Sequence, residues 1–218
     1  MRLLRLSLAA LVVALAPLAA VVVQAAPPTR AEALRALEQA DAAARRGAVE
    51  RLAEVGRMED VDRLLARLDD ADPAVRELAA AATWQIWSRS GDPAVDKLFA
   101  RGMAQMEAAA LEDALATFSA IVKKKPAFAE GWNKRATILF LLGRFEESLK
   151  DCDQVLKRNP KHFGALSGAG QIHLQLGNAE RALDYFRRAL AVNPNLRGAA
   201  EIVPVLEEML RHEGPQRT

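Results

Sequence analysis

The chain has 218 residues, of which 51% are hydrophobic and only 5% aromatic, with 30 basic and 28 acidic residues. Alanine and leucine are abundant, and strand-like alternation of apolar and polar residues is nearly absent, so the sequence predicts an all-α protein. The balanced charge gives little support to a nucleic-acid partner, which needs a basic surface. The single cysteine excludes a disulfide within the chain.

Residues 1–26 have the pattern of a secretory signal peptide. Arg2 and Arg5 precede an apolar run that ends at Val23, and a small-residue cleavage pattern ends at Ala25. We expect cleavage there, which removes both arginines, lowers the formal net charge from +2 to 0, and leaves the mature chain exported, in the periplasm. The apolar run is barely long enough to cross a bilayer, so the alternative is an uncleaved anchor, which is then the only contact with the membrane.

Residues 27–92 predict a helical module followed by a short polar linker. Breaks at Gly47, Gly56 and Pro73 separate four helical segments. These segments are 31–46, 48–55, 58–68 and 74–87. The stretch LLARLDDADPAVRELAAAA, which starts at Leu64, resembles a HEAT-type repeat. This resemblance implies an ion pair between an arginine and a turn aspartate, here Arg76 with Asp70 or Asp72, and a module that caps the N-terminal end of the following helical stack.

Trp84 and Trp87 lie three residues apart on one face of the last helix of this HEAT-like module. We expect them to form the seam between this module and the rest of the chain. The alternative is an exposed aromatic surface that binds a ligand.

From residue 93 onward the sequence repeats itself every 34 residues, as the spacing of Pro126, Pro160 and Pro194 shows. The same step relates further columns of similar residues: Gly102, Ala136 and Gly170; Ala109, Gly143 and Gly177; Ala114, Ser148 and Ala182; Phe118, Cys152 and Phe186. This pattern resembles the tetratricopeptide repeat, a helix-turn-helix unit with small residues, a glycine turn and a closing proline. The units run from 95 to 128, 129 to 162 and 163 to 196, within a repeat region of 93–196.

The resemblance implies a right-handed α-solenoid of three helix pairs, because a single unit cannot bury its faces alone. Residues 197–218 complete it as a capping helix and tail. Gly143 and Gly177 are expected in the turns, where a left-handed backbone favours glycine. The columns of small residues are expected where the two helices of a unit cross.

The resemblance also implies a concave groove, lined by the first helix of each unit, that holds a peptide or a partner helix. The residues that we expect to bind the partner are Phe99, Met103, Asn133, Lys134, Thr137, Phe140, Leu141, Ser167, Gln171 and Leu174. A clamp for a C-terminal carboxylate requires several basic residues in this family. Of the corresponding positions only Lys134 is basic, which disfavours that ligand.

The sequence holds no constellation typical of catalysis, of a metal site or of a cofactor. None of the three histidines, His162, His173 and His212, has another ligand at a recognised spacing. Cys152 falls in a column of buried residues, which predicts a packed thiol and not a nucleophile. We therefore expect a protein that is not an enzyme and needs neither metal nor cofactor.

Arg101 and Arg135 occupy a column in which the family usually has leucine. They either pair with a nearby carboxylate, Glu107, Asp113 or Glu147, or point into the groove, where they favour an acidic ligand.

The function that fits these observations is an exported scaffold or adaptor that binds a protein or a peptide. The alternatives are a membrane-anchored envelope assembly factor, an accessory domain of an enzyme that acts on envelope polymers, and self-association through Trp84, Trp87 or the capping helix. The sequence does not fix the oligomeric state.

Overall fold

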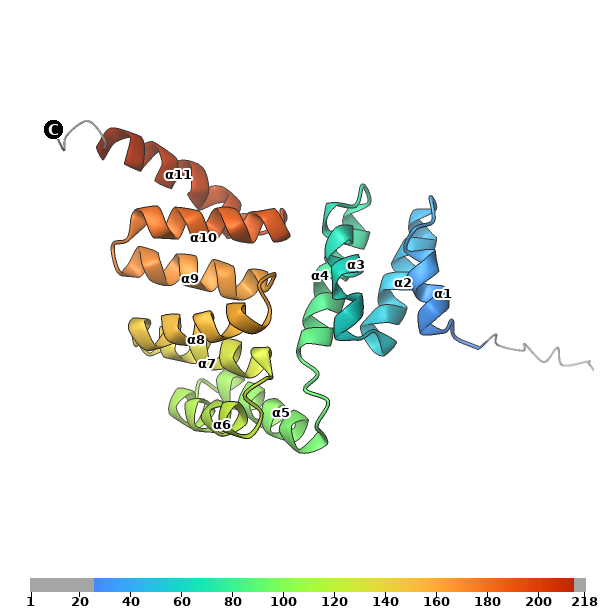
Figure 1. Cartoon of the computed structure of the whole chain (residues 1–218), viewed down its shortest axis with the longest axis horizontal. Helices are drawn as coiled ribbons and strands as arrows, with labels where there is room; N and C mark the ends of the chain where they lie inside the picture. Colours follow the sequence, from blue (N-terminus) through green and yellow to red (C-terminus); the bar gives the residue numbers. More distant parts are fainter. Residues whose placement is uncertain (1–25, 214–218) are drawn as a thin grey trace, which may run out of the picture.

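The computed structural model describes residues 26–213, which form eleven α-helices, two short 3-10 helices and no strand (Figure 1). The N-terminal module comprises α1 (Arg30–Ala36), α2 (Ala42–Val55), α3 (Val61–Leu65) and α4 (Pro73–Trp87), with the 3-10 helices Met58–Asp60 and Ala66–Asp69 on either side of α3. The prediction of an all-α protein is confirmed. The predicted signal peptide and the last residues of the tail fall on 1–25 and 214–218, outside the described residues.

The repeats comprise three antiparallel helix pairs stacked in chain order, followed by one further helix (Figure 1). They are α5 (Pro93–Glu107) with α6 (Leu111–Lys124), α7 (Ala129–Leu141) with α8 (Phe145–Arg158), α9 (Phe163–Gln175) with α10 (Ala179–Val192), and finally α11 (Arg197–Glu213). The predicted solenoid of three helix pairs and a capping helix is therefore confirmed. Leu206 and Ala199 of α11 are buried against α10 and close the last unit.

The turn inside each unit has the left-handed backbone that the glycine column predicts. Gly143 and Gly177 have φ angles of 72° and 73°. Ala109, the residue in the same column of the first unit, also has a positive φ, 55°. The turn geometry is thus imposed by the helix pair and is kept in the first unit against the preference of an alanine.

Where the two helices of a unit cross, a small residue on the first helix packs against a larger residue on the second. A Cβ added at Gly102 would lie 2.6 Å from a ring carbon of Phe118, and one added at Gly170 would lie 2.8 Å from Phe186. In the second unit the corresponding residues are Ala136 and Cys152, which are buried in one cluster. Alanine is larger than the glycine of the other two units, and cysteine is smaller than their phenylalanine. The combined side-chain volume at the crossing therefore stays similar along the stack.

The core of the N-terminal module is built from apolar residues of α1 to α4. Its fully buried members include Leu37, Leu52, Leu64, Leu68, Val75 and Ile86. The same cluster contains Phe163, the first residue of α9, and Val192 and Leu196 pack against it. The two parts of the chain therefore share one core.

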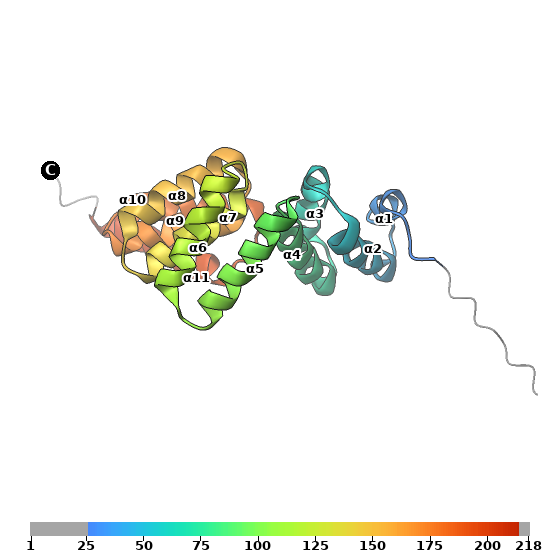
Figure 2. The ribbon, with the colours of Figure 1, turned by 90° about the horizontal axis from the view of Figure 1, so that it is seen from below.

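The N-terminal module packs along the side of the stack and not on its end. Figures 1 and 2 show α4 nearest to the repeats, α1 farthest from them, and a short linker that leads from α4 to α5 at the end of the stack. Because α4 contacts Phe163, and Leu196 packs against the core of the module, the module lies against the third unit, and the expectation that it caps the N-terminal end is wrong. The linker, residues 88–92, lets the chain turn and run back beside the module.

The ion pair predicted for Arg76 is also wrong. Arg45 contacts both carboxylate oxygens of Asp70 at 2.8 Å, and Arg46 contacts Asp72 at 2.7 Å. Since two arginines of α2 already bind these carboxylates, Arg76 donates instead to backbone carbonyl oxygens of the turn, at 2.7 and 3.3 Å.

The coupling at the helix crossing can be tested by giving the third unit the pair found in the second. Gly170→Ala is expected to lower the free energy of unfolding by about 1–3 kcal/mol through overpacking, and Phe186→Cys by about 3 kcal/mol or more through the cavity it leaves. The double variant should lose at least about 1 kcal/mol less than the sum of the two, because the alanine enters the space that the ring vacates. Urea denaturation measures all three values.

The control for this cycle is Gly168→Ala on the same helix. No atom lies within 4 Å of a Cβ at that position, so the variant should be more stable by about 0.5–1 kcal/mol, the usual gain from replacing a helical glycine. Strict additivity of Gly170→Ala and Phe186→Cys would contradict the proposed coupling.

Candidate protein-binding groove and the adjoining seam

An aromatic cluster joins α4 to the start of α9. Trp87 stacks on His162, with ring centroids 4.3 Å apart and an interplanar angle of 18°, and Trp84 meets the same ring edge-on at 5.2 Å. Both indoles also contact Phe163, at centroid distances of 5.3 and 5.0 Å. Trp84 and Trp87 therefore form the seam between the two modules, as the sequence predicts, and not an exposed ligand surface.

Trp84 also determines which residue can stand at the start of α9. A Cβ at Gly164 would lie 2.5 Å from the indole of Trp84, so no larger side chain fits there while the seam is closed. The Nζ atom of Lys134, on α7, lies 5.4 Å from the centroid of the same indole, a cation–π distance. Trp84 thus covers the end of the groove at which α7 and α9 begin.

A buried carboxylate lies next to this aromatic cluster. Glu130, which is 1% exposed, accepts hydrogen bonds from Nε2 of His162 at 2.9 Å and from Nδ2 of Asn133 at 3.1 Å. Its charge is balanced by Lys134, whose Nζ lies 3.2 Å away. The Nδ1 atom of His162 accepts the backbone N–H of Ala165 at 3.1 Å, so the ring hydrogen is on Nε2, facing the carboxylate. The histidine connects the first turns of α7 and α9.

The contacts of Glu130 keep its side chain ionised. Burial raises the pKa of the carboxyl group, but the hydrogen bond from His162 and the positive charge of Lys134 outweigh it, and the pKa of Glu130 lies below its ordinary value. The stability that these contacts provide is complete above the ordinary carboxyl pKa of about 4.3. It is lost as the pH falls through the lower pKa of the folded state.

Outside the aromatic cluster, two polar contacts also join the N-terminal module to the repeats. Asn195 Nδ2 donates to the backbone carbonyl oxygen of Leu68 at 2.6 Å. Lys161 Nζ lies 2.9 Å from Asp62, but this pair is exposed and adds little stability. The hydrogen bond of Asn195 therefore holds the α10–α11 corner against the N-terminal module.

The structure divides the predicted groove residues into three sets. Four pack partly into the cores of the repeats: Phe99, Met103, Phe140 and Leu174. Two contact the buried Glu130: Asn133 and Lys134. The remaining four are exposed or half-buried on α7 and α9: Thr137, Leu141, Ser167 and Gln171. The accessible part of the groove is therefore the half of α7 and α9 that lies away from the seam.

A small hollow of about 70 Å³ lies between α7 and α9, and its lining extends from Gly164, which Trp84 covers, to Phe140. Phe140, Cys152 and Ile172 supply apolar walls, whereas Thr137 and Gln171, which are exposed, supply a hydroxyl and an amide. The hollow has the size of a small apolar side chain, with hydrogen-bonding groups beside it. This arrangement suits an extended peptide that inserts one side chain.

Glu130 and His162 are the site residues that the sequence pattern does not identify. The pattern places Glu130 at a groove position and His162 in a turn. Their separation of 32 residues, close to one repeat, puts them at corresponding ends of neighbouring helix pairs. The spacing alone is uninformative, because the packing of Trp84 and Trp87 on His162 brings in a helix from outside the repeats.

The remaining expectations concern side chains of the repeats. Cys152 is buried, and burial raises the pKa of its thiol to about 12, as expected for a packed residue and not a nucleophile. Arg135 binds both carboxylate oxygens of Asp151, at 2.6 and 2.7 Å. Arg135 therefore pairs with a carboxylate and does not point into the groove. Its partner, Asp151, is not one of the three carboxylates that the sequence analysis names. Arg101 is exposed.

Within residues 26–213 no group of three or more His, Cys, Asp or Glu side chains is arranged to hold a metal ion. In the same range, no helix combines the length and the apolar character needed to cross a bilayer.

The stacked helix pairs define the protein as a helical-repeat solenoid. A family model described as tetratricopeptide repeat matches residues 99–155 and 135–197. A TPR repeat-containing protein of Rhizobium etli is 33% identical over 151 residues, which cover 69% of this chain and 74% of that protein. The chain belongs to the tetratricopeptide repeat family.

Other similar proteins match a smaller share of this chain. The Hsp70-Hsp90 organizing protein of Triticum aestivum is 28% identical over 103 residues, which cover 47% of this chain and 18% of that protein. Among solved structures, the first TPR domain of RPAP3 (Spaghetti), bound to an HSP90 peptide, superposes with a TM-score of 0.52 at 20% identity. It covers 54% of this chain and 93% of that domain. The structural likeness establishes the fold of the repeat region.

Replacing Glu130 by glutamine tests the buried network. At neutral pH, Glu130→Gln should lower the free energy of unfolding by about 1–3 kcal/mol, because Lys134 loses its counter-charge and one hydrogen-bond acceptor is weakened. The difference from the wild-type chain should shrink as the pH falls below about 4, since the wild-type carboxyl then takes up a proton. Urea unfolding followed by tryptophan fluorescence at several pH values measures it.

The matched control is Glu146→Gln, a change of the same kind at an exposed position of the same repeat. It should leave both stability and its pH dependence almost unchanged. If Glu130→Gln and the wild-type chain lost stability in parallel on acidification, Glu130 would not be ionised in the folded state.

Proposed function

We propose that this chain is a non-catalytic adaptor that receives an extended peptide segment of a partner protein in the groove between α7 and α9. The observation that carries the proposal is the hollow bordered by Thr137, Phe140 and Gln171. It combines an apolar recess with exposed hydrogen-bonding groups on two parallel helices. Such a surface can bind one side chain of an extended peptide in the recess and form hydrogen bonds with the peptide backbone.

The seam narrows the choice of ligand. Lys134, the one basic residue at the positions of a carboxylate clamp, is bound to Glu130 and lies over Trp84. Gly164, another of those positions, is covered by the same indole. We therefore propose an internal peptide segment, and not a C-terminal carboxylate, as the ligand of the groove. The HSP90 peptide bound by RPAP3 supports a peptide partner in general, without indicating which one.

Site-specific photocrosslinking in cells tests the groove. A photoreactive amino acid at Thr137 or Gln171 should capture one dominant partner, because both side chains are exposed beside the hollow. The same amino acid at Lys150, which is exposed on α8, should not. Mass spectrometry of the adducts identifies the partner, and Phe140→Ala should reduce crosslinking from Thr137 by removing one wall of the hollow. Equal capture from all three positions would refute a dedicated groove.

We further propose that the adaptor acts outside the cytoplasm, as a periplasmic protein released by cleavage near Ala25. The support is the order of basic, apolar and small residues in the first 26 positions. An uncleaved anchor is the alternative, and the adaptor is then an envelope assembly factor with the same groove.

The N-terminus and location of the chain recovered from cells test this proposal. We expect the recovered chain to begin at or next to Ala26 and to be released with the periplasmic contents. A matched variant with Arg2 and Arg5 changed to glutamate should accumulate uncleaved in the cytoplasm, because the basic segment of the signal is lost. A full-length chain in the membrane fraction would favour the anchored alternative, and a full-length soluble chain in the cytoplasm would refute export.

A further inference from the structure

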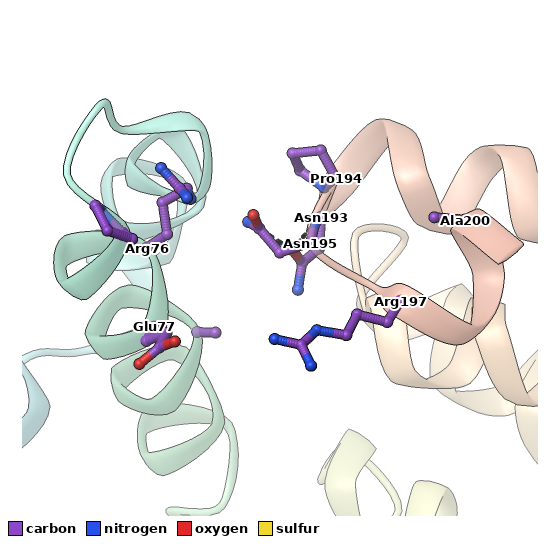
Figure 3. Close-up of a pocket in the computed structure, with 9 residues that line it drawn as sticks. Arg76, Glu77, Asn193, Pro194, Asn195, Arg197 and Ala200 are labelled. Atoms are coloured by element: carbon purple, nitrogen blue, oxygen red, sulfur yellow. Dashed lines mark hydrogen bonds between the residues drawn. The ribbon is translucent and has the colours of Figure 1, made fainter.

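A cleft of about 550 Å³ opens where the N-terminal module meets the α10–α11 corner (Figure 3). The first turns of α4 form one wall, with Arg76 and Glu77, and the corner forms the other, with Asn195 and Arg197. This cleft is separate from the groove between α7 and α9, and none of its lining residues has a part in the proposed peptide site. Its volume lies in the range of pockets that bind small molecules, roughly 300–1,000 Å³.

Among residues 26–213, Arg76 has no carboxylate partner, because two arginines of α2 bind the nearby carboxylates. Asp70 is bound by Arg45, and Asp72 by Arg46. Arg76 donates two hydrogen bonds to backbone carbonyl oxygens of the turn, which fix its guanidinium group without neutralising it. A guanidinium group has five N–H donors, so this arginine is oriented and keeps donors for a ligand.

Arg197 supplies the second positive charge from the opposite wall. In Figure 3 its side chain extends from the start of α11 into the space in front of α4. Within residues 26–213, neither Arg197 nor Glu77 forms an ion pair, although they border the same cleft. With two arginines and one glutamate, the lining is positively charged overall and suits a ligand with one anionic group.

The walls of the cleft are held at a fixed spacing. The hydrogen bond from Asn195 to the carbonyl of Leu68 crosses from one wall to the other module. Pro73 and Pro194, one on each side, restrict the backbone next to the cleft. The two walls, and the guanidinium group of Arg76 on one of them, are therefore positioned before a ligand arrives, which lowers the entropic cost of binding.

We propose that this cleft binds a ligand that carries a compact oxyanion, with Arg76 and Arg197 as the two residues that bind it. A carboxylate and a phosphate both match the planar fork of a guanidinium group. Such a group can belong to the C-terminus of a short peptide or to a small phosphorylated molecule. Glu77 disfavours a ligand with several anionic groups close together.

Amide NMR titrations of the full chain, as it is recovered from cells, test the proposal with three probes. These are inorganic phosphate, acetyl-tetraalanine with a free C-terminal carboxylate, and the same peptide as its C-terminal amide. We expect saturable shifts at the amides of Arg76, Asn195 and Arg197 with phosphate or with the free acid, but not with the amide. Saturation by the free acid alone indicates a peptide C-terminus, and saturation by phosphate alone a phosphorylated molecule.

Three single variants make the assignment specific. Arg197→Gln, at an exposed position that folding does not need, should weaken binding roughly tenfold or more, the loss of one charge-assisted contact. Glu77→Gln should tighten binding, because it removes the one negative charge of the lining. Arg101→Gln, an exposed arginine on α5, should change nothing and controls for the loss of a positive charge.

Several results would overturn the proposal. They are the absence of saturable shifts with both phosphate and the free acid, equal shifts with the peptide amide, and an unchanged affinity of Arg197→Gln. Crosslinking from Thr137 in the groove should be unaffected by Arg197→Gln, so failure of the cleft and failure of the groove are distinguishable.

Discussion

The structure depends on the packing of Trp84 and Trp87 against His162 and Phe163. Aromatic pairs of this kind contribute about 0.5–1.5 kcal/mol each beyond the burial of their surface, and four cross-seam ring contacts are made here. The cluster joins segments that are far apart in the sequence, and it fixes α4 along the side of the repeats. Without it the N-terminal module would be held by the short linker, by the packing of Val192 and Leu196 against its core, and by polar contacts at the surface.

Within the repeats a second constraint acts, the fixed volume at each helix crossing. Glycine opposite phenylalanine in the first and third units and alanine opposite cysteine in the second fill the same space with different side chains. Another pair of facing positions, one on each helix of a unit, also changes its side chains between the first and third units. Gln105 hydrogen-bonds Thr117 at 2.7 Å in the first unit, and His173 stacks on Tyr185 in the third. The repeat therefore conserves geometry while its chemistry changes.

The period of the sequence was sufficient to predict the helix pairs, their turns and the capping helix, because each depends on contacts inside one unit or between neighbouring units. The placement of the N-terminal module was not predictable in this way. Its contacts with Phe163 and Leu196 involve residues that the repeat pattern already explains as ordinary members of their columns. The aromatic pair on α4 predicted that a seam exists, but nothing in its spacing indicated which surface it covers.

The candidate groove illustrates the same limit at the level of single residues. Thr137, Phe140 and Gln171, three of the family positions, line one hollow between α7 and α9. The family pattern also assigned Asn133 and Lys134 to the ligand, whereas the structure shows both bound to Glu130. The difference arises because α4 packs on His162, the partner of the buried Glu130, and a buried carboxylate needs hydrogen-bond donors, which Asn133, Lys134 and His162 supply. A binding pattern inherited from a family is reliable only where no other part of the chain changes the burial of its residues.

The helix α4 borders both surfaces. Trp84 closes the end of the groove, and Arg76 on the same helix forms one wall of the cleft. A ligand that contacts both walls of the cleft binds only the docked arrangement and therefore stabilises it, by an amount that grows with ligand concentration. The hollow bordered by Thr137, Phe140 and Gln171 is present in this same docked arrangement. A ligand in the cleft is therefore expected to hold the two modules together and to leave the proposed peptide site unchanged.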